Sequence, residues 1–207
     1  MFVVSAGLMR SGSTWLYNAL RLILSKGTNR RLKADLYHQR KWKNVKHGLV
    51  KAHEFHIHLA DKADFVFTSH RDIRDACASL SRFQPNRHPG AVIAKITEQF
   101  QHYQKWAQIA DYDMQYEHML EDPLQVLDQL ASRLKLPHVD ILAIYQELTA
   151  IAPPPPETRA EDPQTLLWPN HITDGRAGKF AETLDDDFVQ IIEHRFGAWL
   201  RANGYLV

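Results

Sequence analysis

Gly7-Leu8-Met9-Arg10-Ser11-Gly12-Ser13-Thr14 stands between a β-rich run, residues 2–6, and a stretch with helical periodicity, residues 14–25. A strand, a glycine-rich turn and a helix in this order are typical of a loop that binds phosphate. The glycines let the backbone turn sharply, and the helix adds the positive end of its dipole. The serine and threonine hydroxyl groups of the segment add further donors. The alternative is a glycine- and serine-rich turn that holds no ligand.

The cation of this loop is displaced from its usual position. The glycines keep the spacing of the nucleotide triphosphatase pattern, Gly-x4-Gly-Lys-Ser/Thr, but Ser13 stands where the lysine belongs and Arg10 lies inside the loop. The usual lysine reaches the β- and γ-phosphates, and the hydroxyl after it holds magnesium. We therefore expect a nucleotide with a single substituted 5′-phosphate group, and no metal.

Strand-like and helix-like segments alternate along the rest of the chain. The predicted strands are 2–6, 48–52, 65–69 and 113–116, and the predicted helices are 14–25, 72–83, 90–110, 122–135, 139–148 and 185–202. Residues 27–47 and the loop from 153 to 183 are predicted to be irregular. This alternation predicts an α/β fold with a mostly parallel central sheet flanked by helices. A chain of 207 residues suits a single domain, 1–207.

Composition argues against several classes of partner. The chain has 25 basic and 24 acidic residues, so its bulk charge predicts no nucleic-acid partner, and any anion site must come from local clusters such as Arg30, Arg31 and Lys33. The single cysteine, Cys77, cannot form an intrachain disulfide and is expected to be a small buried side chain. With no basic leader and no apolar run of about 20 residues, we expect a soluble cytoplasmic protein without a membrane span.

Four segments resemble, in order, the motifs of sulfotransferases that use 3′-phosphoadenosine 5′-phosphosulfate (PAPS). Met9-Arg10-Ser11-Gly12-Ser13-Thr14-Trp15 resembles the 5′-phosphosulfate loop, which commonly reads Pro-Lys-Ser-Gly-Thr-Thr-Trp. Val50-Lys51-Ala52-His53 is similar to the Lys-Thr-His segment. Residues 69–79 are similar to the 3′-phosphate segment, in which a serine follows an arginine after eight residues. Tyr116-Glu117-His118-Met119 is similar to the Tyr-Glu-Asp-Met segment.

The resemblance implies a P-loop-like sulfotransferase fold and a sulfuryl transfer from PAPS. A hydroxyl or amine of the acceptor, a small molecule or a glycan, attacks sulfur in line, and adenosine 3′,5′-bisphosphate (PAP) leaves. The residues implied at the nucleotide are Arg10, Ser11, Gly12, Ser13, Thr14, Trp15, Arg71, Ser79 and Tyr116. Trp15 would stack on adenine, or would be a core residue of the first helix. Arg71 would hold the 3′-phosphate with Ser79, or would pair with Asp72 or Asp75 on the surface.

The implied catalytic residues are His53, Lys51 and Arg10. His53 would be the general base, a role that suits an imidazole near neutral pH. Residues i and i+2 of a strand point the same way, so Lys51 and His53 would face one site. Lys51 and Arg10 would stabilise the charge that develops on the leaving group. A partly buried polar pair is the alternative for Lys51 and His53.

A looser match lies near the carboxyl terminus. Gly175-Arg176-Ala177-Gly178-Lys179-Phe180 resembles the family pattern Arg-Lys-Gly-x-x-Gly-Asp-Trp, and Gly175 and Gly178 keep the spacing of its glycines. Thr173 and Asp174 stand in place of the Arg-Lys pair, so Arg176 or Lys179 is expected to substitute. This segment would suit a flap over the nucleotide.

Several alternatives remain open from the sequence. A kinase of the P-loop type would share the loop but need magnesium and a loop lysine. A non-catalytic nucleotide-binding relative is favoured by Arg10 and by the incomplete carboxyl-terminal motif. Residues 37–46 would line an acceptor pocket or form a solvated loop. The group His53, His56 and His58 lacks the i, i+4 spacing of a zinc-binding helix, so no metal site is predicted.

Overall fold

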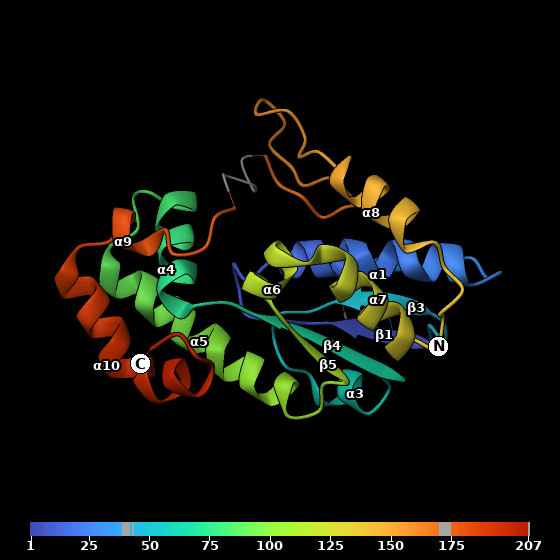
Figure 1. Ribbon diagram of the computed structural model, residues 1–207, viewed down its shortest axis with the longest axis horizontal. Helices are drawn as coiled ribbons and strands as arrows, with labels where there is room; N and C mark the ends of the chain where they lie inside the picture. The colour runs from blue at the N-terminus through green and yellow to red at the C-terminus, as the bar shows by residue number, and fades with distance from the viewer. Residues whose placement is uncertain (39–41, 43, 170–174, 207) are drawn as a thin grey trace.

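The computed structural model describes residues 1–38, 42, 44–169 and 175–206, and this part of the chain forms a five-stranded sheet at its centre (Figure 1). The strands are β1 (Phe2–Ser5), β2 (Ala34–Leu36), β3 (Gly48–Lys51), β4 (Phe65–His70) and β5 (Tyr112–Gln115). Their order is β2-β3-β1-β4-β5, and neighbouring strands are parallel. The predicted α/β fold with a parallel sheet is therefore confirmed.

Two groups of helices accompany the sheet (Figure 1). The first comprises α1 (Ser13–Gly27), α6 (Tyr116–Glu121), α7 (Pro123–Arg133) and α8 (Ile141–Thr149), and the second comprises α4 (Ile73–Phe83), α5 (Pro89–Ala107), α9 (Phe180–Thr183) and α10 (Asp186–Ala202). The short helix α3 (Ile57–Ala60) follows β3. Within the described ranges, no helix combines the length and the apolar character that crossing a bilayer would require.

The predicted strands and helices are confirmed to within a few residues at each end, but four short elements were missed. The expectation that residues 27–47 are irregular is wrong at β2, and the expected loop from 153 to 183 contains α9. Alanine and aspartate are poor strand formers, so β2 exists because its backbone pairs with β3, with Asp35 opposite Val50. The short helices α3, α6 and α9 carry too few residues for a periodic signal.

The hydrophobic core holds α1 in place. This helix follows the predicted phosphate-binding segment, residues 7–14, which we call the phosphate loop. Leu16, Leu20 and Ile23 of α1 are fully buried in one cluster with Val3 and Phe67 of the sheet. Burying a side chain of this size contributes roughly 1.5–3 kcal/mol each. The amino end of α1 is therefore held rigidly against the sheet.

Parallel strands bring the four sequence motifs to one edge. Ser5, the last residue of β1, pairs with Lys51 of β3 and with Phe67 of β4. β1 thus lies between the two strands that carry the second and third motifs, and β5 ends directly before Tyr116. In open α/β sheets this carboxyl edge is where ligands bind.

Candidate active site

A cavity of about 310 Å³ lies at the carboxyl edge of the sheet. The predicted site residues that line it are Arg10, Gly12, Ser13, Thr14, Trp15, Arg71, Ser79, Tyr116 and Gly175. They come from the phosphate loop, α1, the end of β4, α4, α6 and the segment before α9. The structure therefore brings together residues that lie up to 165 positions apart, from Arg10 to Gly175.

Gly12 is a loop position at which the backbone and its surroundings both exclude a side chain. Its φ is 77°, and a Cβ added to it would lie 2.8 Å from Cδ2 of Tyr116. The absence of a side chain lets the chain enter α1 while the Tyr116 ring closes on the loop. The amino end of a helix leaves its first N–H groups without intrahelical partners, so those of α1 are available to an anion in the cavity.

Replacing Gly12 with alanine is expected to lower the free energy of unfolding by roughly 2–4 kcal/mol, because left-handed strain and the clash with Tyr116 add together. Gly204→Ala is the matched control, since Gly204 has the same φ of 77° but nothing within 4 Å of its added Cβ. Urea unfolding of both variants measures the difference. Equal losses would show that the Tyr116 contact does not constrain the loop.

Ser11 does not line the cavity, unlike Ser13 and Thr14. It is fully buried, and its Oγ donates to the Leu8 carbonyl at 2.6 Å and lies 2.8 Å from Oγ of Ser69. Its hydroxyl therefore fastens the loop to β4, while Ser13 and Thr14 line the cavity.

Lys51 and His53 are each bonded to the phosphate loop. Nζ of Lys51 donates to Oγ1 of Thr14 at 2.5 Å, and Nδ1 of His53 lies 3.1 Å from the Gly7 carbonyl oxygen. A carbonyl only accepts, so Nδ1 carries the proton and Nε2 keeps a free lone pair. The pair flanks the loop, outside the residues that line the cavity.

The charge states of the pair follow from its surroundings. Burial lowers the pKa of Lys51 from 10.5 to about 7, with Glu161 opposing the shift and Arg10 adding to it. Burial also lowers the pKa of His53 to about 4, and the neighbouring Lys51 charge acts in the same direction. Near neutral pH His53 is a neutral imidazole, which is the form that accepts a proton.

The structure joins the loop cation Arg10 to the third motif, residues 69–79. Nε of Arg10 donates to Oγ of Ser79 at 2.9 Å. The Arg10 guanidinium lies 4.8 Å from the centre of the Phe83 ring. Burial, followed by the charges of Arg71 and Arg82, lowers the pKa of Arg10 to about 10, so it stays cationic at neutral pH. Arg10 therefore faces the arginine–serine segment of β4 and α4.

Arg71 is buried rather than paired at the surface. Its Nη2 donates to Asp75 at 3.1 Å and to the Arg176 carbonyl at 2.7 Å. Its guanidinium carbon lies 4.3 Å from the centre of the Tyr116 ring. The pairing with Asp75 exists, as one alternative expected, but both side chains are buried rather than at the surface. Of the two, Arg71 lines the cavity.

The other end of the cavity is apolar. Trp15 lies here, partly exposed to the cavity and partly packed against the core, together with Met119, Leu148 and Leu167. Sequence reasoning missed Leu148 and Leu167, because nothing in their local pattern distinguishes them from ordinary core residues. Arginine and hydroxyl side chains together with apolar side chains give a lining that would suit a nucleotide.

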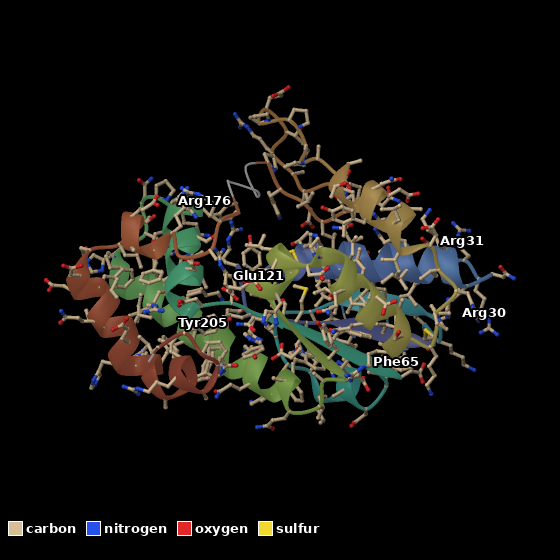
Figure 2. The ribbon with its side chains drawn as sticks, in the orientation of Figure 1. Arg30, Arg31, Phe65, Glu121, Arg176 and Tyr205 are labelled. Carbon is tan, nitrogen blue, oxygen red and sulfur yellow. The ribbon has the colours of Figure 1, made fainter. Side chains whose placement is uncertain are left out.

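The carboxyl-terminal segment reaches the site through its backbone. Tyr116 donates its hydroxyl proton to the Gly175 carbonyl at 2.7 Å, and the Gly178 N–H donates to Asp75 at 2.7 Å. The Arg176 guanidinium instead lies 3.3 Å from Glu182 on the surface. Figure 2 shows Arg30 and Arg31 on the other side of the molecule from Arg176, and neither Arg30 nor Arg31 lines the cavity.

Some expectations fall on residues outside the described ranges. Thr173 and Asp174 are among these, as are residues 39–41 and 43 of the segment considered for the acceptor. Among the residues that the structure does describe, no group of three or more His, Cys, Asp or Glu side chains could hold a metal ion.

No protein-family model matches the sequence, and no curated protein matches it either. Solved structures do match. Mouse sulfotransferase SULT7A1 complexed with PAP matches with a TM-score of 0.70 at 14% identity, over 97% of this chain and 83% of that one. Retinol dehydratase with androsterone and the inactive cofactor PAP matches with a TM-score of 0.64 at 15% identity, over 96% and 80%. Its complex with retinol and PAP gives 0.67 at 15% identity, over 96% and 81%. The chain therefore has the sulfotransferase fold.

Proposed function

We propose that this chain, as one catalytic domain over residues 1–207, transfers a sulfuryl group from PAPS to a hydroxyl or amine of an acceptor. The observation that carries this proposal is the hydrogen bond of 2.9 Å between Arg10 and Ser79. It places the phosphate loop and the arginine–serine segment at one cavity, as a nucleotide with phosphates at both its 5′ and 3′ positions requires. A fold that similar proteins use with PAP supports the same conclusion.

The 5′-phosphosulfate would lie at the amino end of α1. The N–H groups of the first turn and the hydroxyls of Ser13 and Thr14 would bind its oxygens. As the acceptor oxygen bonds to sulfur, the bond from sulfur to the bridging oxygen breaks, and negative charge moves onto the PAP phosphate. Lys51, held at Thr14, would stabilise that charge.

The 3′-phosphate would lie between Arg71, Arg10 and Ser79. Arg71 is only 5% exposed, and its guanidinium is already held by Asp75 and by the Arg176 carbonyl. A preorganised guanidinium binds phosphate with little loss of side-chain entropy. The adenine would occupy the apolar end, against Trp15 and Tyr116.

His53 would accept the proton of the attacking group. Its Nδ1–H is held by the Gly7 carbonyl, which fixes the ring and leaves Nε2 as the accepting atom. A neutral imidazole at this position suits general base catalysis.

The acceptor in this proposal is a small molecule that carries a hydroxyl group. Retinol dehydratase, which has a similar fold, was crystallised with androsterone and with retinol. We place the reaction in the cytoplasm, because Cys77 is a buried free thiol and no disulfide can form within the chain.

A thermal-shift comparison tests nucleotide choice. PAP at about 100 times its Kd is expected to raise Tm by roughly 5–10 °C, whereas ATP and ADP with Mg²⁺ should raise it by less than about 2 °C. A larger shift with ATP and Mg²⁺ would favour the kinase. A PAP shift without sulfuryl transfer to any acceptor in a broad panel would favour a non-catalytic relative.

A further inference from the structure

Asp75 lies at the centre of the contacts behind the cavity, although the sequence motifs give it no role. It is 1% exposed, and its carboxylate accepts hydrogen bonds from three groups. Nη2 of Arg71 donates at 3.1 Å, the Gly178 N–H at 2.7 Å and the Phe180 N–H at 2.9 Å. One buried carboxylate thus joins the proposed phosphate-binding arginine to the segment 175–180.

The segment 175–180 is attached to the site by main-chain atoms at four residues. The carbonyl of Gly175 accepts from Tyr116 and that of Arg176 accepts from Arg71, both at 2.7 Å. The N–H groups of Gly178 and Phe180 donate to Asp75. The Phe180 ring also lies 4.2 Å from the guanidinium carbon of Arg74. The segment is therefore fastened to α4 and α6 by contacts within the protein.

Arg71 keeps one donor for a ligand. Its Nε is buried and has no hydrogen-bond partner among the described residues, although the side chain lines the cavity. Leaving a buried donor unpaired is unfavourable, so a ligand that accepts from Nε would be bound more tightly. Asp75 accepts from Nη2 of the same guanidinium, which restricts the rotation of the group and so the direction in which Nε–H points.

We propose that Asp75 is a positioning residue that orients Arg71 toward the 3′-phosphate and holds segment 175–180 over it. This inference rests on the proposed function for the identity of the ligand. It differs from a purely electrostatic role, because a carboxylate near a phosphate repels it. If Asp75 acted only through its charge, removing the charge would tighten nucleotide binding. If it acts by positioning, removing it weakens binding.

The first experiment compares the wild-type chain with Asp75→Asn in the absence of nucleotide. An amide has a single accepting oxygen, so at least one of the three donors loses its partner. Trypsin cleavage after Arg176 or Lys179, identified by fragment mass, is expected to become about tenfold faster, because proteolysis follows local opening. Glu182→Gln is the matched control, since it breaks the exposed pair with Arg176 and leaves the backbone contacts in place.

The second experiment measures affinity by calorimetry for PAP and for AMP, which lacks the 3′-phosphate. Asp75→Asn is expected to weaken PAP binding about tenfold and AMP binding less than about twofold, because the oriented Arg71 serves the 3′-phosphate. A merely structural role would weaken both nucleotides alike. Equal losses, or unchanged or tighter PAP binding, would overturn the inference.

The two experiments also separate this inference from the proposed function. If the wild-type chain does not bind PAP, the proposed function fails. The trypsin comparison still tests whether Asp75 keeps segment 175–180 in place. Cleavage of Asp75→Asn at the wild-type rate would contradict the claim that Asp75 keeps this segment in place. Should Asp75→Asn fail to fold by circular dichroism, Asp75→Glu keeps the charge and displaces the oxygens by one methylene. Faster cleavage and weaker PAP binding by Asp75→Glu support the inference, and wild-type values refute it.

Discussion

Replacing His53 with alanine is expected to lower kcat by roughly 10²–10⁴-fold, the usual contribution of a general base. PAP affinity should stay within about twofold of the wild-type value, because His53 lies outside the residues that line the cavity. Steady-state kinetics with PAPS and calorimetry with PAP measure the two effects. The control is His194→Ala, since His194 is exposed, and it should change neither kcat nor the affinity for PAP.

His53→Asn separates the base from the contact with Gly7. The asparagine amide can donate to the Gly7 carbonyl, as Nδ1 of His53 does at 3.1 Å, but it offers no basic nitrogen. If the role of His53 is to accept a proton, His53→Asn loses as much activity as His53→Ala. Recovery of activity in His53→Asn would instead make His53 a support for the phosphate loop and leave the base unassigned.

Replacing Lys51 with methionine is expected to lower kcat by roughly 10²–10³-fold, since a donor that faces developing charge contributes about this much. Methionine fills the space of the buried Lys51 stem and buries no charge, so the loss should fall on the chemical step more than on fold stability. Lys26→Met is the matched control, because Lys26 lies at the surface in an exposed pair with Glu147. Equal loss of activity in the two variants would contradict a role for Lys51.

The pH profile carries a second signature of Lys51. His53 is neutral above its pKa of about 4, and Lys51 is cationic below its pKa of about 7. The kcat/KM of the wild-type enzyme should therefore rise through pH 4 and fall through pH 7. Bound phosphosulfate raises the pKa of Lys51, so the falling limb of kcat lies at higher pH. In Lys51→Met the falling limb should disappear, and its persistence would assign that limb to another group.

The sequence predicted more about the proposed nucleotide site than about the acceptor. The phosphate loop and Arg71 each follow a strand end, and Tyr116 begins a helix, so their places could be read from local patterns. Ser79 lies inside α4 and was found by its spacing of eight residues from Arg71. The substitute for the Arg-Lys pair could not be read in this way. Arg176 or Lys179 was expected to substitute, and this stays a prediction. The Arg176 guanidinium lies 3.3 Å from Glu182, and carbonyl and N–H groups of the segment meet Arg71 and Asp75.

Local patterns in the sequence determine the fold class. Alternating apolar runs and a glycine-rich turn specify a parallel sheet with a loop at its carboxyl edge. The tertiary structure alone decided that Arg10 bonds Ser79, that β2 joins the sheet and that Asp75 holds residues more than 100 positions away. These contacts depend on side-chain direction and on pairing between distant segments. Neither leaves a periodic trace in the sequence, whereas burial of a strand or of a helix face does.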